Sequence, residues 1–153
     1  MRRIDGLLSK YGDNHQNKFN KLIHWFGVTM IFFSIVGLLW AVPFPLETSA
    51  FVNWATLTMV PVAAYYLYLS PRLAMGMILQ LAVFSVLTHL LATRVSTPLW
   101  MISAVIFVIA SVLQFIGHMV EGQKPAFLAD LRALLIGPAW LMHFVYQRVG
   151  LRY

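Results

Sequence analysis

Long apolar stretches alternate with short polar turns along this chain of 153 residues. A helix needs about 20 apolar residues to cross roughly 30 Å of hydrocarbon, because it rises about 1.5 Å per residue. The pattern predicts four spanning helices, separated by turn sequences such as "PFPLETSA" and "SPR", at about 22–42, 51–69, 73–93 and 99–120. We expect Pro61 to kink or break the second span. The predicted fold is therefore an all-α integral membrane helical bundle that forms a single domain over 1–153.

The last apolar segment, at about 126–149, is less regular than the four spans. Gly137 and Pro138 interrupt it, and a Gly-Pro pair commonly ends or kinks a helix. One continuous span is possible here. We favour an interfacial helix at about 126–136, a break, and then a short half-inserted helix at about 138–149. That last helix would be only about 16 Å long, about half of the hydrocarbon core.

The composition strengthens the membrane interpretation. Hydrophobic residues make up 60% of the chain and charged residues 10%, against roughly 25% charged in ordinary soluble domains. The chain has no cysteine, which excludes disulfides, thiolate metal sites and cysteine nucleophiles. The net charge of +6 fits anionic lipid headgroups better than nucleic acid, and no nucleic-acid-binding motif accompanies it.

The positive charges predict an orientation, because cytoplasmic segments of membrane proteins carry more lysine and arginine. Residues 1–21 are polar and basic, and we expect a cytoplasmic segment with a short helix near 4–11. With the N-terminus inside, eight of the 11 Lys and Arg residues would be cytoplasmic, against at most three outside: Arg94 and, if the last segment crosses, Arg148 and Arg152. The short loops are typical of a bacterial protein, so we expect an inner-membrane protein whose N-terminus, and any functional site at that end, lies on the cytoplasmic side.

Polar residues recur on one face of the fourth predicted span. Gln114, His118 and Glu121 are four and three residues apart, which places them on one side of a helix. Polar groups in hydrocarbon cost several kcal/mol unless they are paired or bind something. His118 and Glu121 alone would make a buried hydrogen-bonded pair between helices. The alternative is that this face binds a ligand.

The five histidines can be sorted by their predicted depth. His15, His24 and His118 all fall at the cytoplasmic end of the bundle. His143 follows the predicted break and would lie about 8 Å deep on that side. We expect these four to converge in one pocket. His89 lies near the opposite end of its span, about 20 Å away, and is left out.

Several imidazoles with a carboxylate and no thiolate are a ligand set that suits Fe(II) or Zn(II). Asn20 is four residues before His24, so it can orient the His24 ring or anchor the N-terminal segment. Glu121 can accept from the second ring nitrogen of a ligand histidine, or bind the metal itself. Gln114 can reach a bound substrate or water. The hypothesis is a metal site with His15, His24, His118 and His143 as ligands.

Three motifs in this chain resemble those of a known family. They are "HQNKFNKLIHWFGV" at 15–28, "QFIGHMVEGQKPAFLADL" at 114–131 and "LLIGPAW" at 134–140. Together they resemble the 2-hydroxy fatty acid dioxygenase family, small membrane proteins whose fungal members act in phytosphingosine breakdown. The resemblance covers nearly the whole chain, and the order and separation of its two histidine blocks match.

The resemblance implies a non-heme Fe(II) dioxygenase that uses O2 to shorten 2-hydroxy fatty acids by one carbon, an α-oxidation. The family's essential histidines correspond to His15, His24 and His118, and its motif glutamate to Glu121. Fungal members carry a glutamate where this chain has His143, an exchange that fits a ligand role. The implied partners are a 2-hydroxy fatty acid, O2 and membrane lipid; the oligomeric state is left open.

Three other functions stay open on the sequence alone. A heme-binding membrane electron carrier would use two of the histidines as axial ligands. A zinc hydrolase would use the same ligand set without O2. A non-catalytic scaffold or small transporter would use the polar face to pack helices or pass protons.

Overall fold

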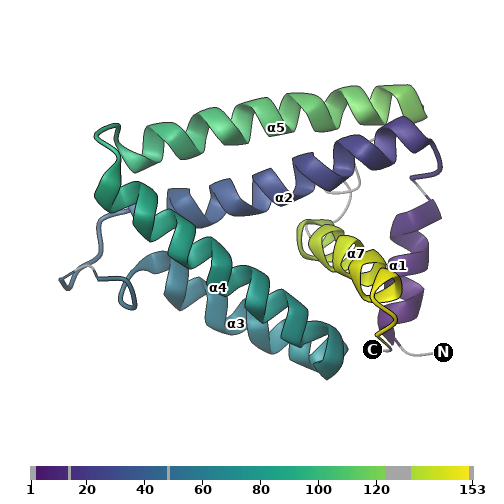
Figure 1. The fold of residues 1–153 in the computed structure, drawn as a ribbon, viewed down its shortest axis with the longest axis horizontal. Coiled ribbons are helices and arrows are strands. Elements are labelled where there is room, and N and C mark those ends of the chain that lie inside the picture. Colours follow the sequence, from purple (N-terminus) through teal and green to yellow (C-terminus); the bar gives the residue numbers. More distant parts are fainter. Residues whose placement is uncertain (1–2, 14, 48, 123–131, 152–153) are drawn as a thin grey trace.

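The computed structural model describes residues 3–13, 15–47, 49–122 and 132–151. Within these ranges the chain is helical and contains no strand (Figure 1). The helices are α1 (Arg3–Asp13), α2 (Lys18–Ala41), α3 (Trp54–Leu69), α4 (Pro71–Arg94), α5 (Leu99–Glu121) and α7 (Ala133–Arg148). The predicted all-α class and the short N-terminal helix are confirmed.

Three of the described helices, α2, α4 and α5, are long and apolar enough to cross a membrane. With 23 or 24 residues each, they are about 35 Å long. The second predicted span, at 51–69, corresponds to α3, which has 16 residues and is about 24 Å long, shorter than the hydrocarbon core. That α3 crosses the membrane stays a prediction. Its helix continues through Pro61, so the chain is not broken there.

Helix α3 starts later than predicted because its first turn is capped. The Asn53 side chain accepts from the Thr56 N–H at 3.0 Å, and the Thr56 hydroxyl accepts from the Asn53 N–H at 3.3 Å. This reciprocal pair is a capping box, which fixes a helix N-terminus. The cap therefore leaves residues 51–53 outside the helix.

Helix α7 runs without interruption through Gly137 and Pro138, so the predicted break at this pair is wrong. Both residues are buried, and the Gly137 backbone packs against the Tyr11 hydroxyl of α1. In the same turn the Tyr66 hydroxyl donates to the Leu135 carbonyl at 2.8 Å. A proline removes only one backbone donor, and tertiary packing here outweighs that loss. Residues 126–131 of the predicted interfacial helix lie outside the described residues.

Helices α2 and α5 lie side by side along most of their length (Figure 1). Their backbones approach closely because glycine faces a polar side chain at three levels of the pair. These contacts join Gly117 to Asn20, Gly27 to Gln114, and Gly37 to Ser103. Small residues allow this kind of approach between helices in membranes. The pair thus holds polar residues of α2 and α5 in a fixed register.

Helix α7 lies between α2 and the α3–α4 pair, with α1 beside it at the end that carries both termini (Figure 1). The Tyr146 hydroxyl donates to the Arg72 carbonyl at 2.8 Å, which places the C-terminal end of α7 at the α3–α4 turn. Arg148 therefore lies at the end of the bundle where α2 begins, and not at the opposite end, which the sequence had left open for it. Arg152 lies outside the described residues.

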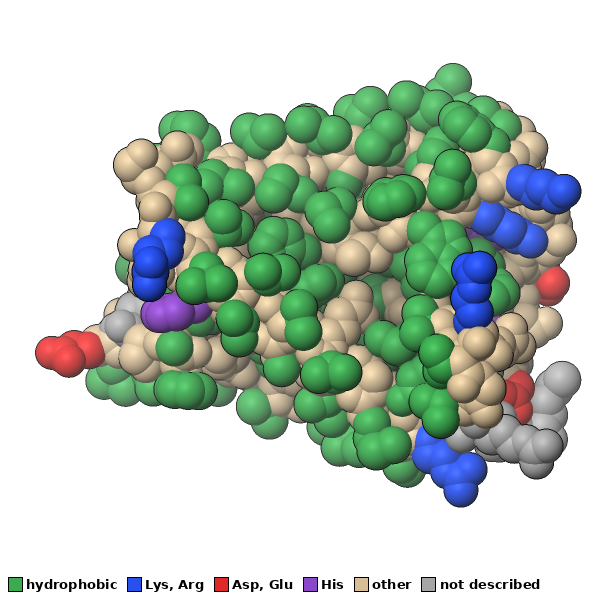
Figure 2. Space-filling view, in the orientation of Figure 1, with side chains coloured by type: hydrophobic (Ala, Val, Ile, Leu, Met, Phe, Trp, Pro, Cys, Tyr) green, Lys and Arg blue, Asp and Glu red, His purple; other side chains and the backbone are tan. Residues whose placement is uncertain are grey.

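The visible surface has an apolar band between two ends that carry the charged side chains (Figure 2). The long helices run across this band. This distribution is the one expected of a protein that crosses a membrane, where charged groups remain at the water interfaces.

Candidate metal centre

Three histidines from distant parts of the sequence meet at the N-terminal end of the bundle. His15 lies between α1 and α2, His24 is on α2, and His118 is on α5. Each offers one ring nitrogen, and these three atoms lie within 4.8 Å of one another. The ring centroids are 4.1 Å (His15–His24), 4.8 Å (His24–His118) and 5.3 Å (His15–His118) apart. All three side chains are buried.

Backbone carbonyls fix which nitrogen carries the proton on two of these rings. His15 Nδ1 lies 2.7 Å from the Tyr11 carbonyl, and His24 Nδ1 lies 2.9 Å from the Asn20 carbonyl. A carbonyl oxygen only accepts, so both Nδ1 atoms must donate. In the neutral rings both Nε2 atoms then carry a lone pair, and these two atoms face each other at 2.9 Å. Two lone pairs at this distance repel unless a proton or a cation lies between them.

The third ring adds a nitrogen that is free to bind a cation. His118 Nδ1 is buried and has no hydrogen-bond partner among the described residues. Buried polar atoms without partners are rare in native proteins, and a bound ion is one way in which such atoms are satisfied. Two ligand nitrogens about 2.1 Å from one cation and at right angles are about 3.0 Å apart. The His15–His24 spacing, together with a ring nitrogen of His118 within 4.8 Å, therefore fits a shared divalent cation.

Tyr11 and Trp140 enclose His15, and neither was identified from the sequence. The Tyr11 ring stacks on His15, with centroids 4.5 Å apart and planes 14° apart, and Trp140 lies 5.4 Å from His15. Burial lowers the pKa of His15 below its ordinary value. A neutral imidazole is the form that binds a metal. The available sequence signals were the four-residue step from Tyr11 to His15 and, for Trp140, its place in the motif at 134–140.

Glu121 connects the end of α5 to the start of α2. Its carboxylate accepts from the Gln16 N–H at 2.8 Å, the Asn17 N–H at 3.0 Å and the Asn20 Nδ2 at 2.9 Å. From the sequence, Glu121 could accept a hydrogen bond from a ligand histidine. In the structure, the Nδ1 atoms of His15 and His24 donate to backbone carbonyls instead. Glu121 therefore holds in place the segment that carries His15.

Asn20 and Gln114 are both buried beside the histidines. Asn20 contributes twice, since its carbonyl holds the His24 ring and its amide donates to Glu121. The Gln114 Nε2 has no hydrogen-bond partner among the described residues. This nitrogen packs against Gly27 of α2, and the Gln114 side chain also lines the same cavity as His24 and His118.

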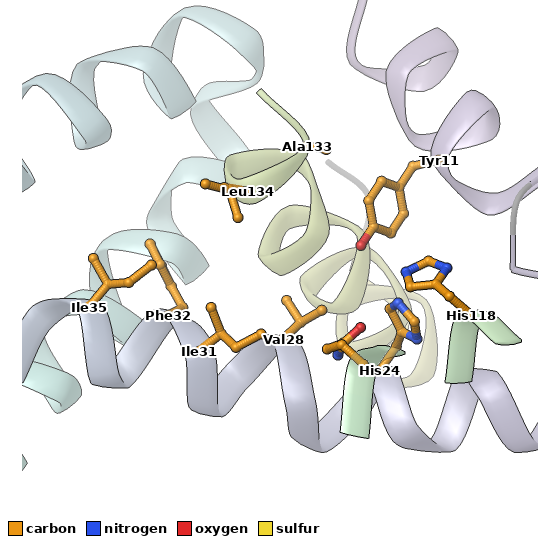
Figure 3. Close-up of a pocket in the computed structure, with 10 residues that line it drawn as sticks. Tyr11, His24, Val28, Ile31, Phe32, Ile35, His118, Ala133 and Leu134 are labelled. Carbon is orange, nitrogen blue, oxygen red and sulfur yellow. The ribbon is translucent and has the colours of Figure 1, made fainter. Parts of the chain in front are cut away.

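A cavity leads from the histidines along α2 (Figure 3). One end is polar, with Tyr11, His24, His118 and Gln114, and the rest of the wall is apolar. The apolar wall is formed by Val28, Ile31, Phe32, Ile35, Ala133 and Leu134. A cavity with this division suits an amphipathic ligand whose polar end lies at the histidines.

The other two histidines lie elsewhere. His143 is half-buried on α7 and lines a different hollow, which it shares with His15. It is not one of the three residues whose nitrogens lie together, so its ligand role stays a prediction. His89 is exposed, and its ring lies 6.0 Å from Trp40 near the other end of α2. The structure thus keeps His89 away from the cluster, as the sequence indicated.

The fold and the site define a helical protein of membrane type with a buried cluster of three histidines. The model of one family, described as 2-hydroxy-palmitic acid dioxygenase Mpo1-like, matches residues 1–71 and 72–149. The chain therefore belongs to the Mpo1-like family. Comparisons with curated proteins and with solved structures found no match.

Proposed function

We propose that this protein is an Fe(II)-dependent dioxygenase that shortens 2-hydroxy fatty acids by one carbon. The observation that carries the proposal is the pair of unprotonated nitrogens of His15 and His24, facing each other at 2.9 Å. The unpartnered nitrogen of His118 and the cavity beside it support the same function. The family description names a 2-hydroxy-palmitic acid dioxygenase.

The proposed reaction balances without an external reductant. It converts R–CHOH–COOH and O2 into R–COOH, CO2 and H2O. The bond between C1 and C2 breaks, C1 leaves as CO2, and C2 becomes the new carboxyl carbon. This oxidation releases four electrons, and one O2 takes up all four. The products are an acid one carbon shorter and one CO2 for each O2 consumed.

His15, His24 and His118 would hold the iron through their free nitrogens. A bound Fe(II) with open coordination positions would supply the redox chemistry with O2. The Tyr11 and Asn20 carbonyls keep the first two rings in one tautomer and one orientation, as outer hydrogen bonds to metal ligands do.

The cavity would place the substrate with its acid end at the histidines. The Gln114 side chain, which lines the polar end of this cavity, would bind the carboxylate or the 2-hydroxyl group. Since a polar donor without a partner is costly in a buried site, this hydrogen bond would favour a polar head over a plain alkyl end. The apolar wall along α2 would exclude water from the rest of the ligand.

We also propose that the site lies on the cytoplasmic side, in a bacterial inner membrane. Lys21 and Arg148 line one hollow at the histidine end, and Arg72 lies at the same end. Arg94 ends α4 at the far end. Positive charge gathers on the cytoplasmic side of membrane proteins.

The direct test is product formation by the purified, iron-loaded protein with 2-hydroxypalmitate and O2. We expect pentadecanoic acid and CO2 in equal amounts, with matching O2 consumption. A yield no higher than that of the His118→Ala variant would contradict the proposal.

The same preparation distinguishes the other functions. A zinc hydrolase would act without O2, and a scaffold or transporter would hold no stoichiometric metal. A heme carrier would show a Soret band. His15 Nε2 and His24 Nε2 are only 2.9 Å apart, which leaves no space for a heme between them. The geometry therefore disfavours these two histidines as an axial pair.

A further inference from the structure

A second cavity continues the one that starts at the histidines. Its wall contains residues from α2, α3, α4 and α7, and three residues, Phe32, Ile35 and Leu134, line both cavities. Its lining is apolar apart from Thr58. The Thr58 hydroxyl already donates to the Trp54 carbonyl at 2.7 Å, so it is not an unused donor in the wall.

One face of α2 forms the floor of both cavities. From His24 the lining residues follow at steps of three or four, through Val28, Ile31 and Ile35 to Leu39, as Figure 3 shows for the first part. Residues at these steps lie on one side of a helix. The 15 steps from His24 to Leu39 span about 22 Å at the helical rise. An extended acyl chain advances about 1.3 Å per carbon, given a bond of about 1.5 Å, so about 16 to 18 carbons would fit.

The far end of the second cavity lies where α2 ends and α3 begins. Leu39 is in the last turn of α2, and Ala55 is in the first turn of α3. Ala55 is only 1% exposed, and its side chain is small. A larger side chain at this position would occupy the end of the cavity and leave the histidines untouched.

We propose that the two cavities form one channel that binds the acyl chain of the substrate, and that Ala55 sets its length limit. The proposal rests on the proposed function for the identity of the ligand. Three observations carry it: the shared lining residues, the polar groups confined to one end, and the match between channel and chain length. The channel would place the reacting carbons at the histidines and the terminal methyl group near Ala55.

The first test is a competition among 2-hydroxy acids of graded chain length, with products resolved by mass. We expect the wild-type protein to prefer about 16 carbons, and Ala55→Phe to prefer chains shorter by about three carbons, since a phenyl ring reaches roughly 4 Å beyond the alanine methyl group and each carbon advances about 1.3 Å. Ala55→Leu should shift the preference less. Leu57→Phe is the matched control, because Leu57 is on the same helix, is 53% exposed and lines neither cavity. An unchanged preference in Ala55→Phe would overturn the channel.

The second test does not depend on turnover. A 2-hydroxy fatty acid of 16 carbons with a photoreactive diazirine at its methyl end is cross-linked to wild-type protein in lipid nanodiscs. We expect labelling of the peptide that contains Ala55 and Met59, and loss of this labelling with excess 2-hydroxypalmitate. Labelling that excess 2-hydroxypalmitate leaves unchanged would identify a groove filled by bilayer lipid and contradict the proposal, as would labelling confined to other peptides.

Together the two tests separate the channel from the reaction. Specific labelling at Met59 without product from any chain length would reject the dioxygenase and keep the channel. Product formation without a shift in Ala55→Phe would reject the channel and keep the dioxygenase. If Ala55→Phe does not fold, the Ala55→Leu variant and the labelling of wild-type protein decide.

Discussion

The two ends of the α2–α5 pair use the same close packing but hold their polar groups differently. At the N-terminal end, Gly117 packs against Asn20, and His24 and His118 are buried beside them. At the other end Gly37 packs against Ser103. There the nearby histidine, His89 of α4, is exposed next to Trp40.

This difference separates a binding site from helix packing. An exposed histidine near an interface keeps its contact with water or headgroups, so it needs no buried partner. Buried imidazoles with unused lone pairs are costly unless a proton or a cation satisfies them. The close glycine contacts occur at both ends, so they indicate helix packing only. The unsatisfied ring nitrogens at the N-terminal end indicate ligand binding.

Replacing one histidine at each end should give the largest difference in dioxygenase turnover. We expect His24→Ala to lower dioxygenase turnover by more than about 100-fold, because a metal ligand and its fixed orientation are both lost. His89→Ala should keep wild-type turnover. The measurement is the initial rate of pentadecanoate formation. Equal losses in the two variants would remove the distinction between the ends.

A Glu121 variant tests whether hydrogen bonds beyond the three histidines position the metal site. Glu121→Gln keeps the size of the side chain but turns a donor toward the N–H groups of Gln16, Asn17 and Asn20. We expect iron affinity to fall about 10- to 100-fold, as for other losses of outer hydrogen bonds at metal sites. The measurement is iron titration against a competing chelator. Unchanged affinity would show that this carboxylate does not position the site.

Two glycine variants compare packing at the two ends directly. A Cβ at Gly117 would collide with Asn20, and a Cβ at Gly37 would collide with Ser103. Each Gly→Ala change should destabilise the fold by about 1–3 kcal/mol, as overpacking generally does. Only Gly117→Ala should also weaken iron binding, since Asn20 supports both His24 and Glu121. Thermal unfolding and iron content measure the two effects separately, and iron loss in both variants would contradict this account.

His143 should give the smallest effect. We expect His143→Ala to keep its iron and to change turnover by less than about twofold, because three ligand nitrogens meet without it. Iron content and initial rate are the measurements. Iron loss as large as in His24→Ala would instead restore the four-histidine ligand set that the sequence predicted.

The parts of the fold that depend on local pattern were predictable from the sequence. The span predicted at 73–93 is α4, at Pro71–Arg94, and the span predicted at 99–120 is α5, at Leu99–Glu121. Hydrophobic length was enough to predict these helices. The predicted depth of each histidine in the membrane likewise placed His15, His24 and His118 at the same end of the bundle, where the structure brings them together.

The parts that depend on tertiary contacts were not predictable. Helix α7 continues through Pro138 because α1 and α3 pack on that turn. The predicted depth of His143 was counted from a break at this turn, and the helix has no break there. Trp140 reaches His15 only because α7 folds back against α1. The partners of Glu121 are two backbone N–H groups and the Asn20 side chain, all more than a hundred residues earlier, and the sequence pattern did not pair them with Glu121.

Elemental analysis of the protein purified without chelator tests the central claim most directly, because it counts the cation that the three histidines are proposed to share. We predict about one iron per chain in the wild-type protein and in His89→Ala, and almost none in His24→Ala or His118→Ala. Wild-type protein without stoichiometric metal, or iron that persists in His24→Ala and His118→Ala, would contradict the account.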